Sequence, residues 1–444
     1  MNDITAFLKY CLGYKGNMSR VMASMNWQEL YSFASKQALL GLCFDGIERL
    51  GKEYPEEMKQ NPIRRELLMN WMGKAQQIRR QNRKVNLVAS KLFSMLREDG
   101  MRCCVLKGQG NALMYPNPYS RTPGDIDVWI NASRERIMEY ASKKFELGDD
   151  IRLQHLEASL DGVPVELHFF PCSMNNPIYH ARLQKWFRRN ADLQCSHIVG
   201  LPDEAGDIAI PTTAFNVIYQ LTHLYHHFFD EGIGMRQIID SFLVVNDFSK
   251  NVFLNNDLSN HPVNFSNHPV PLSKEGSTFS PSPSSSGSGD VTAPSRCSEP
   301  LRSKDGGASK PSPNCAGWDR LGGNGDTTST ALDVVQRELK YLGLWKFARA
   351  VMYVLHEALG LPEEKMMAPM DEKRGKLLLA EMLNGGNFGQ HFTKYGHFTQ
   401  QGVAKKYFLK IWRNMHFVRY FPAEALSEPI FRTWHFFWRL KHRR

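Results

Sequence analysis

The spacing of apolar residues separates the chain into helical stretches and one short stretch with the alternation of β-strands. In residues 1–95 the apolar positions recur three or four residues apart, which is typical of amphipathic helices. The same spacing returns in residues 176–254 and again in residues 331–444. Residues 96–175 instead alternate apolar and polar positions over short runs. We therefore predict helical regions at both ends of a small sheet-containing core.

The alternating core predicts a definite order of elements. In chain order they are a strand ending at Leu106, a helix, an acidic strand around residues 125–130, a helix over residues 134–145 and a hairpin over residues 153–168. Asp161 and Gly162 indicate the hairpin, because an Asp-Gly pair between alternating segments favours a type I′ turn. This order predicts an α+β fold, a small mixed sheet with helices on one face.

Residues 255–330 differ from the rest of the chain in composition. Serine, proline and glycine are abundant, and the run from Pro281 to Gly289 contains no other residue type. Such a segment buries too little apolar surface to offset the entropy lost on ordering, so we predict a disordered insertion. It separates two helical regions and can be accommodated as a long surface loop, because closing a longer loop costs little extra entropy.

Length and composition limit the class of protein. The 444 residues exceed what one core normally accommodates, so we expect two or three domains. The hydrophobic fraction of 42% is ordinary for a globular protein, and no stretch reaches the ~20 apolar residues of a membrane span. The N-terminus lacks the pattern of a signal peptide, so we expect a cytoplasmic protein. Eight cysteines without a Cys-x-x-Cys pair indicate neither a disulfide framework nor a zinc site.

The net charge of +10 is unevenly distributed along the chain. From residue 405 onward, lysine and arginine alternate with aromatic residues, as in the segment from Arg432 to Arg439. The favoured interpretation is a helix whose aromatic side chains pack on the core while the basic groups stay solvated. Peripheral contact with a membrane surface is the next alternative, and RNA binding through the aromatic rings is the third.

Two aspartates in the acidic strand are the first candidates for chemistry. Asp125 and Asp127 are two positions apart, so they share one face of a strand while Ile126 and Val128 face the core. Adjacent carboxylates repel each other unless a cation joins them, and Mg²⁺ takes carboxylate and phosphate oxygens together. The pair therefore favours phosphoryl or nucleotidyl chemistry. The alternative is a pair of solvated residues, which is common for an isolated Asp-x-Asp.

Residues upstream of this pair strengthen the chemical interpretation. Lys107 and Gly108 follow a predicted strand and open a helix, where backbone N–H groups can approach a phosphate. Arg121 could bind phosphate, and Gly124 would let the backbone turn tightly before the acidic strand. For Lys107 and Arg121 the alternative is a solvated basic side chain near an acidic loop.

The second strand of the hairpin supplies a third carboxylate. Glu166 and His168 share one face of this strand, and Val165 and Leu167 share the other. If the strand lies beside the acidic strand, Glu166 completes a triad of carboxylates. His168 could contact a nucleotide or an acceptor, or it could be a hydrogen-bonded core histidine.

The order of these motifs resembles that of a known family. The chain is similar to the uncharacterised bacterial nucleotidyltransferases of the DNA polymerase beta-like superfamily in three segments, 106–108, 121–127 and 165–168. Weaker similarity continues in two predicted helical segments, 221–227 and 232–240. Where the broader superfamily has Gly-Ser or Gly-Gly shortly before Asp-x-Asp, this chain has Lys-Gly-Gln-Gly farther upstream.

The resemblance implies a nucleotidyltransferase-type sheet and a transferase that moves a nucleoside monophosphate from a nucleoside triphosphate, such as ATP, to a hydroxyl group. It also implies two Mg²⁺ ions that stabilise the attacking and leaving oxygens. The implied catalytic and metal-binding residues are Asp125, Asp127 and Glu166. The implied nucleotide-binding residues are Lys107, Gly108, Arg121 and His168. The acceptor stays open, whether a small molecule, a protein or RNA.

Other interpretations remain beside this one. A protein with this fold could bind a nucleotide or RNA without catalysis, or it could act as an interaction protein through its basic C-terminal end and its insertion. His223 and His227, at positions i and i+4 of a predicted helix, could present two metal ligands. For these histidines, helix packing or lining of the acceptor pocket is the favoured interpretation.

Overall fold

The computed structural model describes residues 2–257, 330–387 and 403–442. The predicted insertion, residues 255–330, lies outside the described residues apart from its two ends. Within the described part, helices occur at both ends of the chain and a small mixed sheet lies between them in sequence. The predicted α+β fold, a mixed sheet flanked by N-terminal and C-terminal helical regions, is therefore confirmed.

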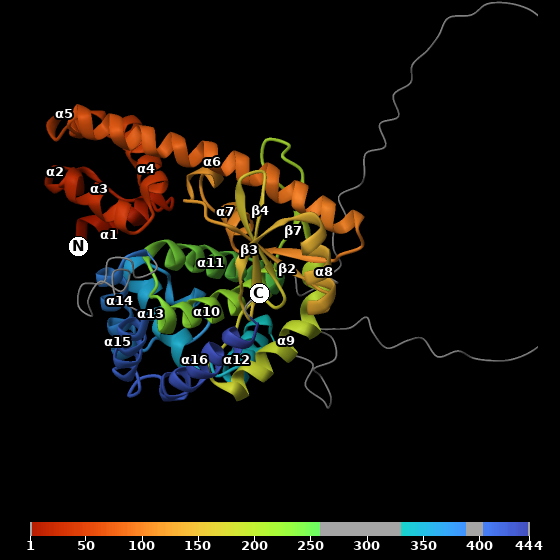
Figure 1. Ribbon diagram of the computed structural model, residues 1–444. Helices are drawn as coiled ribbons and strands as arrows, with labels where there is room; N and C mark the ends of the chain where they lie inside the picture. Colours follow the sequence, from red (N-terminus) through yellow and green to blue (C-terminus); the bar gives the residue numbers. More distant parts are fainter. Residues whose placement is uncertain (1, 258–329, 388–402, 443–444) are drawn as a thin grey trace, which may run out of the picture. The chain divides into compact units, whose positions relative to one another are not determined.

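Six helices form the described N-terminal region. They are α1 (Asn2–Cys11), α2 (Ser19–Ser24), α3 (Trp27–Lys36), α4 (Leu40–Glu53), α5 (Pro55–Gln60) and α6 (Arg65–Glu98). α6 is one helix of 34 residues, because no proline interrupts its amphipathic pattern. Figure 1 shows α6 running from the other N-terminal helices to the sheet. Val85, Leu92 and Leu96 of α6 belong to the same hydrophobic cluster as residues of the strands.

The sheet has five strands in the spatial order β1-β2-β5-β4-β3. They are β1 (Cys103–Leu106), β2 (Ile126–Ile130), β3 (Glu146–Ile151), β4 (His155–Leu160) and β5 (Val163–His168). β2 and β5 are parallel, and the other neighbouring pairs are antiparallel. The connections contain a short helix α7 (Gly108–Ala112), a 3₁₀ turn η1 (Pro118–Ser120) and a helix α8 (Arg134–Lys144). In this order the acidic strand β2 lies between β1 and β5.

The predicted hairpin is present between β4 and β5. Leu160 is opposite Val163, so the turn consists of the two residues Asp161 and Gly162. Their φ angles are 50° and 71°, as a type I′ turn requires at both central positions. The turn therefore sets the register of the hairpin, and with it the residues that face each other across β4 and β5.

Three helices and a short β-ribbon follow the sheet. They are α9 (Pro177–Ser196), the strands β6 (Ile198–Gly200) and β7 (Asp207–Ala209), α10 (Thr213–Asp230) and α11 (Met235–Asp257). The hydrophobic spacing predicted the helices but not the ribbon. Its strands have three residues each, which is too short to display an alternating pattern.

Helices cover both faces of β2, which corrects the prediction of helices on one face only. Ile126 and Val128 are buried in one hydrophobic cluster together with residues of α6 and α8. On the opposite face Trp129 stacks on Phe215 of α10, with 6.1 Å between the ring centroids. Trp129 is the only apolar residue that β2 presents to this second face, so the sequence pattern gave little sign of the second layer.

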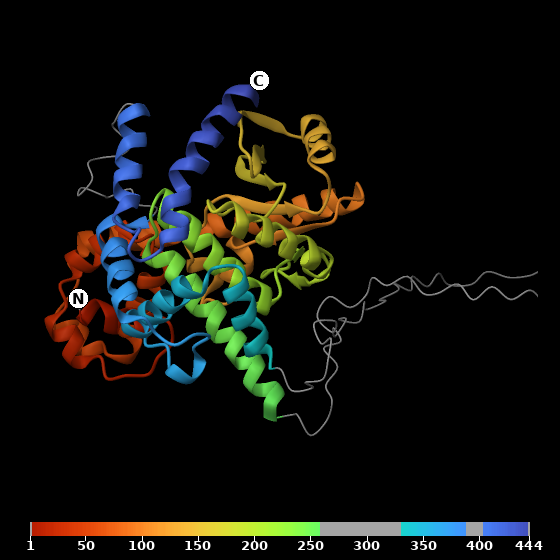
Figure 2. The same ribbon diagram turned by 90° about the horizontal axis from the view of Figure 1, so that it is seen from below.

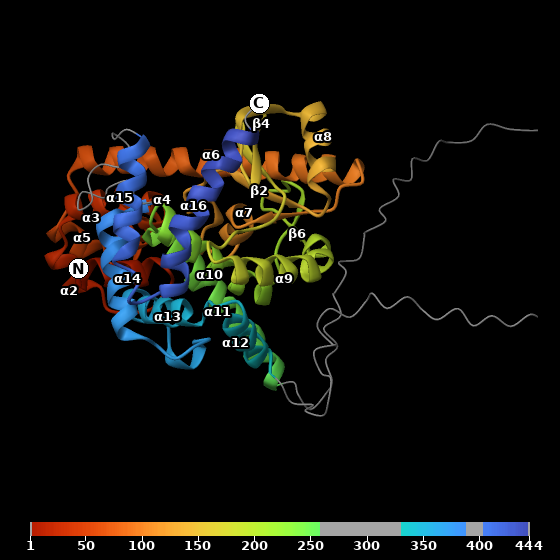
Figure 3. The same ribbon diagram turned by 60° about the horizontal axis from the view of Figure 1, so that its bottom comes forward.

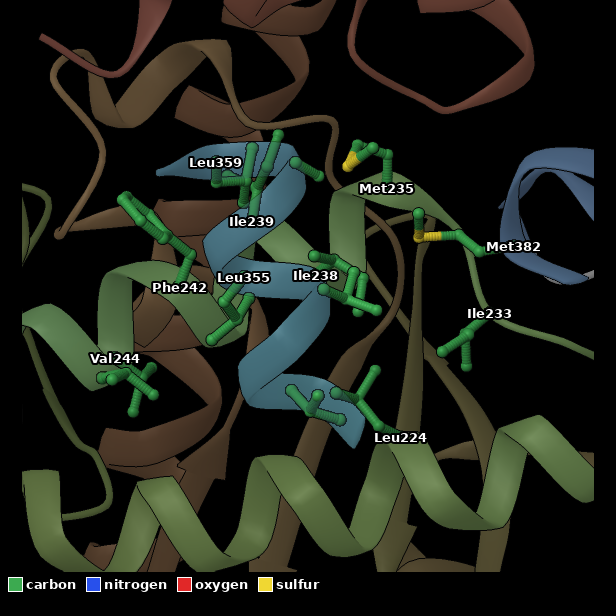
Figure 4. Packing of buried hydrophobic residues seen from close by; sticks show 14 of the residues in the cluster. Leu224, Ile233, Met235, Ile238, Ile239, Phe242, Val244, Leu355, Leu359 and Met382 are labelled. Atoms are coloured by element: carbon green, nitrogen blue, oxygen red, sulfur yellow. The ribbon is translucent and has the colours of Figure 1, made fainter. Parts of the chain in front are cut away.

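The described C-terminal region adds further helices. They are α12 (Ala331–Tyr341), α13 (Trp345–Leu359), α14 (Glu372–Gly385), α15 (Val403–Met415) and α16 (Pro422–His442), with a 3₁₀ turn η2 (Glu363–Lys365). Figure 3 shows α13 beside α12 and α14. In the core, Ile238 and Phe242 of α11 pack with Leu355 of α13 and Leu224 of α10 (Figure 4). This packing holds α10 and α11 in place. Other residues of these two helices line the pocket that is described below.

The C-terminal end agrees only in part with the favoured prediction, because Phe417 and Phe421 pack in the core but other aromatic residues do not. Phe408, Trp434 and Phe437 are 67%, 49% and 63% exposed rather than packed on the core. Arg413 is instead buried, and its guanidinium donates a hydrogen bond to the carbonyl oxygen of Phe228. Figure 2 shows the end of α16 beside the sheet. None of the described helices has the length and apolar character needed to cross a membrane.

Candidate active site

The three acidic residues that were predicted to form a triad lie together on two neighbouring strands. Asp127 in β2 and Glu166 in β5 are opposite each other in the parallel register, so both side chains leave the same face of the sheet. Asp125 comes immediately before β2 and is exposed, whereas Asp127 is buried. Carboxylate oxygens from all three residues lie within 4.8 Å of one another.

Repulsion acts mainly on Asp125, whereas Asp127 is stabilised as a carboxylate. The negative charge of Asp127 is the largest of the effects that raise the pKa of Asp125 to about 6. Burial opposes ionisation of Asp127, but Lys107 and His168 hold the pKa of Asp127 well below its usual range. Three carboxylates therefore share two nearby cationic groups, an arrangement that favours an additional cation.

Lys107 occupies the predicted junction between β1 and α7. The preceding residue, Leu106, pairs with Asp127 across the two strands, which brings Lys107 Nζ to 3.0 Å from Asp127 Oδ2. Nζ also lies 2.8 Å from Nε2 of His223 in α10. The backbone of Lys107 has φ 51° and ψ −129°, a conformation that favours glycine and strains a lysine. Such strain persists only where the surrounding structure holds it, and it is concentrated at functional sites.

Gly108 and Gly124 line the same pocket as the triad. Gly108 has a φ of 38° and begins α7. Gly124 does not have a positive φ, so the predicted tight turn does not explain the glycine at this position. A Cβ atom at Gly124 would meet no atom of the described chain within 4 Å. The position therefore borders open space beside Asp125.

Arg121 is fixed to another wall of the pocket. Its Nε and Nη2 donate hydrogen bonds to the two carboxylate oxygens of Asp240 in α11, at 3.0 and 2.8 Å. The loop around Arg121 is held from behind by the N-terminal helices. Asn82 of α6 donates to the Arg121 carbonyl oxygen, and the Thr122 hydroxyl donates to the carbonyl oxygen of Ala38, both at 2.7 Å. The guanidinium therefore has a defined orientation at the edge of the pocket.

His168 bridges two members of the triad. Its Nε2 lies 3.0 Å from Asp127 Oδ1 and 3.1 Å from Glu166 Oε2. Burial opposes a charge on His168, but these two carboxylates raise its pKa to about 9. His155 is opposite His168 in the β4–β5 pair, and burial lowers the pKa of His155 to about 4. The sequence pattern pointed to His168 but not to His155, because only the hairpin register brings the two rings together.

Two helices downstream of the sheet complete the pocket. α10 contributes Gln220 and His223, and α11 contributes Arg236 and Gln237 from its first turn. The sequence pattern had raised His223 as a possible pocket residue, but not Gln220, Arg236 or Gln237. Arg236 and Gln237 lie in the segment of weaker family similarity, 232–240, and Gln220 lies just before the other such segment.

His223 and His227 of α10 lie close to each other, and His223 also lies close to a lysine. Nε2 of His223 lies 3.0 Å from Nε2 of His227, and His223 also contacts Lys107. Among the described residues, two groups of at least three possible metal ligands occur, and neither includes His223 or His227. His223 lines the pocket, in agreement with the favoured interpretation.

Residues 23–259 match a protein-family model described as an uncharacterised nucleotidyltransferase, and this match spans more than half of the chain. The chain belongs to this nucleotidyltransferase family. The matched segment runs from within α2 to beyond the end of α11, so it includes every pocket residue described above. No curated protein and no solved structure matches the chain. Membership of a nucleotidyltransferase family implies a nucleotide as substrate, and the acidic cluster suits a divalent metal ion.

Proposed function

We propose that this nucleotidyltransferase moves a nucleoside monophosphate from a nucleoside triphosphate to a hydroxyl group of an acceptor, which is a small molecule, a protein or RNA. The observation that carries the proposal is the convergence of Asp125, Asp127 and Glu166, whose oxygens lie within 4.8 Å of one another. The pocket beside them is also lined by Lys107 and two arginines. Carboxylates and cations in one pocket suit a triphosphate and the metal that accompanies it.

The donor set fits Mg²⁺, which prefers carboxylate and phosphate oxygens. Asp125, Asp127 and Glu166 would supply these oxygens. The raised pKa of Asp125, about 6, supports the assignment. It indicates that the negative charge of the neighbouring carboxylates exceeds the positive charge that Lys107 and His168 supply. When bound, two Mg²⁺ ions would lower the pKa of the acceptor hydroxyl and stabilise the departing pyrophosphate.

Basic residues around the triad would bind the phosphates. Lys107 lies nearest to the carboxylates and would act as a point charge on the triphosphate, next to the accessible backbone of Gly108. Arg121 offers a planar guanidinium whose orientation is fixed by Asp240. Arg236, at the start of α11, donates through Nη1 to the Thr122 carbonyl oxygen at 3.0 Å and lines the same pocket. We assign Arg236 to phosphate binding together with Lys107 and Arg121.

His168 has a different task from the one expected of a nucleotide contact. It is 2% exposed, and its Nε2 lies between Asp127 and Glu166. A side chain so deeply buried would orient the two carboxylates rather than reach a base or sugar. We therefore assign His168 to positioning of the triad.

Calorimetric binding of ATP, GTP, CTP and UTP to the full-length protein, each with and without Mg²⁺, tests the proposal. We expect Mg²⁺-dependent binding of at least one nucleotide and at least a tenfold weaker affinity in Asp125→Asn. Glu157→Gln is a matched control, because Glu157 faces Glu166 from β4, one strand farther from Asp127. This control should bind the nucleotide as the wild type does.

The same experiment separates catalysis from simple binding. Pyrophosphate release from the bound nucleotide, on addition of fractionated cell extract, would support transfer to an acceptor. Nucleotide binding that is indifferent to Mg²⁺ and equal in wild type and Asp125→Asn would contradict the proposed metal site. That result would favour a non-catalytic nucleotide-binding protein.

A further inference from the structure

Three potential metal ligands meet at the open end of the β4–β5 hairpin, next to the acidic triad. His155 and His168 are opposite each other in the antiparallel pair, with 4.9 Å between their ring centroids. Glu166 precedes His168 by two residues, so it lies on the same face of the sheet. One ligand atom from each of the three side chains lies within 4.8 Å of the other two.

His155 lacks the partners that a buried imidazole normally has. It is 8% exposed, yet neither ring nitrogen forms a hydrogen bond with any described residue. Its Nδ1 lies 3.4 Å from Glu166 Oε2 and is directed toward the group formed with His168. Buried side-chain polar atoms almost always have a partner, and an exception calls for an explanation such as an ion. The absence of a hydrogen bond at both ring nitrogens is therefore a second observation beside the clustering.

The spacing between the three side chains suits ligands of one ion. Two ligand atoms that each lie about 2.0–2.1 Å from a metal are separated by roughly 3.3 Å in a tetrahedral arrangement and roughly 2.9 Å in an octahedral one. Glu166 Oε2 lies 3.1 Å from His168 Nε2 and 3.4 Å from His155 Nδ1. Glu166 thus stands at ligand-to-ligand distance from both imidazoles.

A neighbouring amide contacts the other nitrogen of the His168 ring. Gln154 Nε2 lies 3.3 Å from His168 Nδ1 and also donates to the Pro171 carbonyl oxygen at 3.0 Å. The contact at Nδ1 turns Nε2 toward Glu166. Because an amide nitrogen donates, Nδ1 accepts in this contact, and the Gln154 amide would have to turn its oxygen toward Nδ1–H when Nε2 binds an ion.

We propose that His155, Glu166 and His168 form a binding site for a divalent transition-metal ion of the zinc class. It lies next to the acid-only site, which consists of Asp125, Asp127 and Glu166 and is where we propose that Mg²⁺ binds. Imidazole nitrogen suits such ions better than it suits Mg²⁺, which prefers oxygen ligands. On binding, His168 releases its Nε2 proton to solvent, and the metal bond replaces the hydrogen bonds of Nε2 to Asp127 and Glu166. His168 therefore positions the triad through hydrogen bonds only while this site is empty. Glu166 faces both sites and can bridge them. This site binds metal whether or not the protein transfers a nucleotide.

Metal titration of the full-length protein tests the site. After removal of bound metal with a chelator, Zn²⁺ binding is measured by calorimetry, and Co²⁺ binding is followed by visible absorption. We expect one Zn²⁺ per chain at this site, and an intense Co²⁺ band typical of nitrogen ligation. His155→Asn should weaken Zn²⁺ binding at least tenfold, because the variant keeps a polar side chain but loses an imidazole ligand.

Two variants serve as controls for the location of the ion. Asp125→Asn should weaken Zn²⁺ binding much less than His155→Asn does, because it removes a nearby charge but no ligand of this site. His227→Asn should keep wild-type Zn²⁺ affinity, because His227 lies in the separate histidine pair of α10. Mg²⁺-dependent nucleotide binding is measured on the same wild-type and Asp125→Asn samples. A protein that binds Zn²⁺ but no nucleotide would leave the metal site standing and overturn only the proposed function.

Three results would overturn the proposed site. They are absence of Zn²⁺ binding, unchanged Zn²⁺ affinity in a folded His155→Asn variant, and loss of Zn²⁺ binding in His227→Asn instead. If His155→Asn does not fold, the wild-type Co²⁺ spectrum decides. A weak spectrum typical of six oxygen ligands would contradict nitrogen ligation, and an intense nitrogen-type spectrum that persists in His227→Asn would support it.

Discussion

Asp127 and Glu166 are opposite each other on the parallel strands β2 and β5. Asp127 is held on its other side by β1, where Leu106 is its partner in the antiparallel register. A slip of one residue in either pairing would move the carboxylate to the opposite face of the sheet, where Ile126 and Val128 are buried. The geometry of the triad therefore depends on the packing that fixes the register of β2.

Replacement of Asp125 by asparagine should stabilise the metal-free protein at high pH. The folded protein raises the pKa of Asp125 from 3.8 to about 6, so ionisation of this group lowers stability as pH rises through that range. Well below pH 3.8 the group is protonated in both states and contributes no difference, and at pH 4 the difference is still small. After allowance for solvent screening, we expect Asp125→Asn to gain about 1 kcal/mol at pH 8.

Urea unfolding of both proteins at pH 4 and pH 8, in the presence of a chelator, measures this effect. The difference between them should be small at pH 4 and should appear at pH 8. It should shrink when Mg²⁺ is added, because the metal relieves the repulsion in the wild type. Equal stabilities at pH 8 without metal would show that Asp125 experiences no net repulsion.

Substitutions of Lys107 should separate its backbone from its charge. Lys107→Gly and Lys107→Met both remove the ammonium group beside Asp127, so both should weaken nucleotide binding to a similar degree. The φ of 51° suits glycine, so Lys107→Gly should be more stable than Lys107→Met by about 1 kcal/mol. Thermal unfolding and nucleotide calorimetry on the two variants check both parts. A less stable glycine variant would argue against backbone strain at this junction.

The ion pair between Arg121 and Asp240 should be a strong contributor to folding. Both side chains are buried, and removal of either partner leaves an uncompensated charge, so Arg121→Met or Asp240→Leu should each cost about 3–5 kcal/mol. The double variant should lose less than the sum of the two. A double-mutant cycle by urea unfolding measures the coupling, and strictly additive losses would contradict it.

Two glycines near the triad should respond differently to alanine. A Cβ at Gly124 meets no described atom, so Gly124→Ala should leave stability unchanged while reducing nucleotide affinity, since the open space lies beside Asp125. A Cβ at Gly110 would lie 2.9 Å from Ile210 Cγ2, so Gly110→Ala should lose about 1–3 kcal/mol. Unfolding curves and nucleotide titrations of the pair compare the two effects. Unchanged nucleotide affinity in Gly124→Ala would remove this position from the proposed pocket.

Local patterns in the sequence predicted much of the sheet and the proximity of the three carboxylates. Asp161 and Gly162 specify a turn through their own backbone preferences, and alternation places Glu166 on a known face of β5. Such signals are contained in a few consecutive residues. They need no knowledge of distant parts of the chain.

The remaining site residues depend on contacts between distant segments, which local patterns do not encode. Asp240 lies 119 residues after Arg121, so nothing near Arg121 indicates that its guanidinium is already paired. His155 becomes notable only when the hairpin register sets it opposite His168. At the C-terminal end, the periodicity predicted helices but did not determine which face packs inward: Arg413 is buried, whereas Phe408 and Trp412 are exposed.

The loop around Arg121 determines how far the functional unit extends toward the N-terminus. The Thr122 hydroxyl is bound to the carbonyl oxygen of Ala38, and Asn82 supports the backbone of Arg121. A truncated chain starting at β1 would retain every proposed site residue, yet both supports of this loop would be gone. We therefore expect the smallest fragment that keeps this loop in place to begin before α4, in a stretch of sequence that carries no catalytic motif of its own.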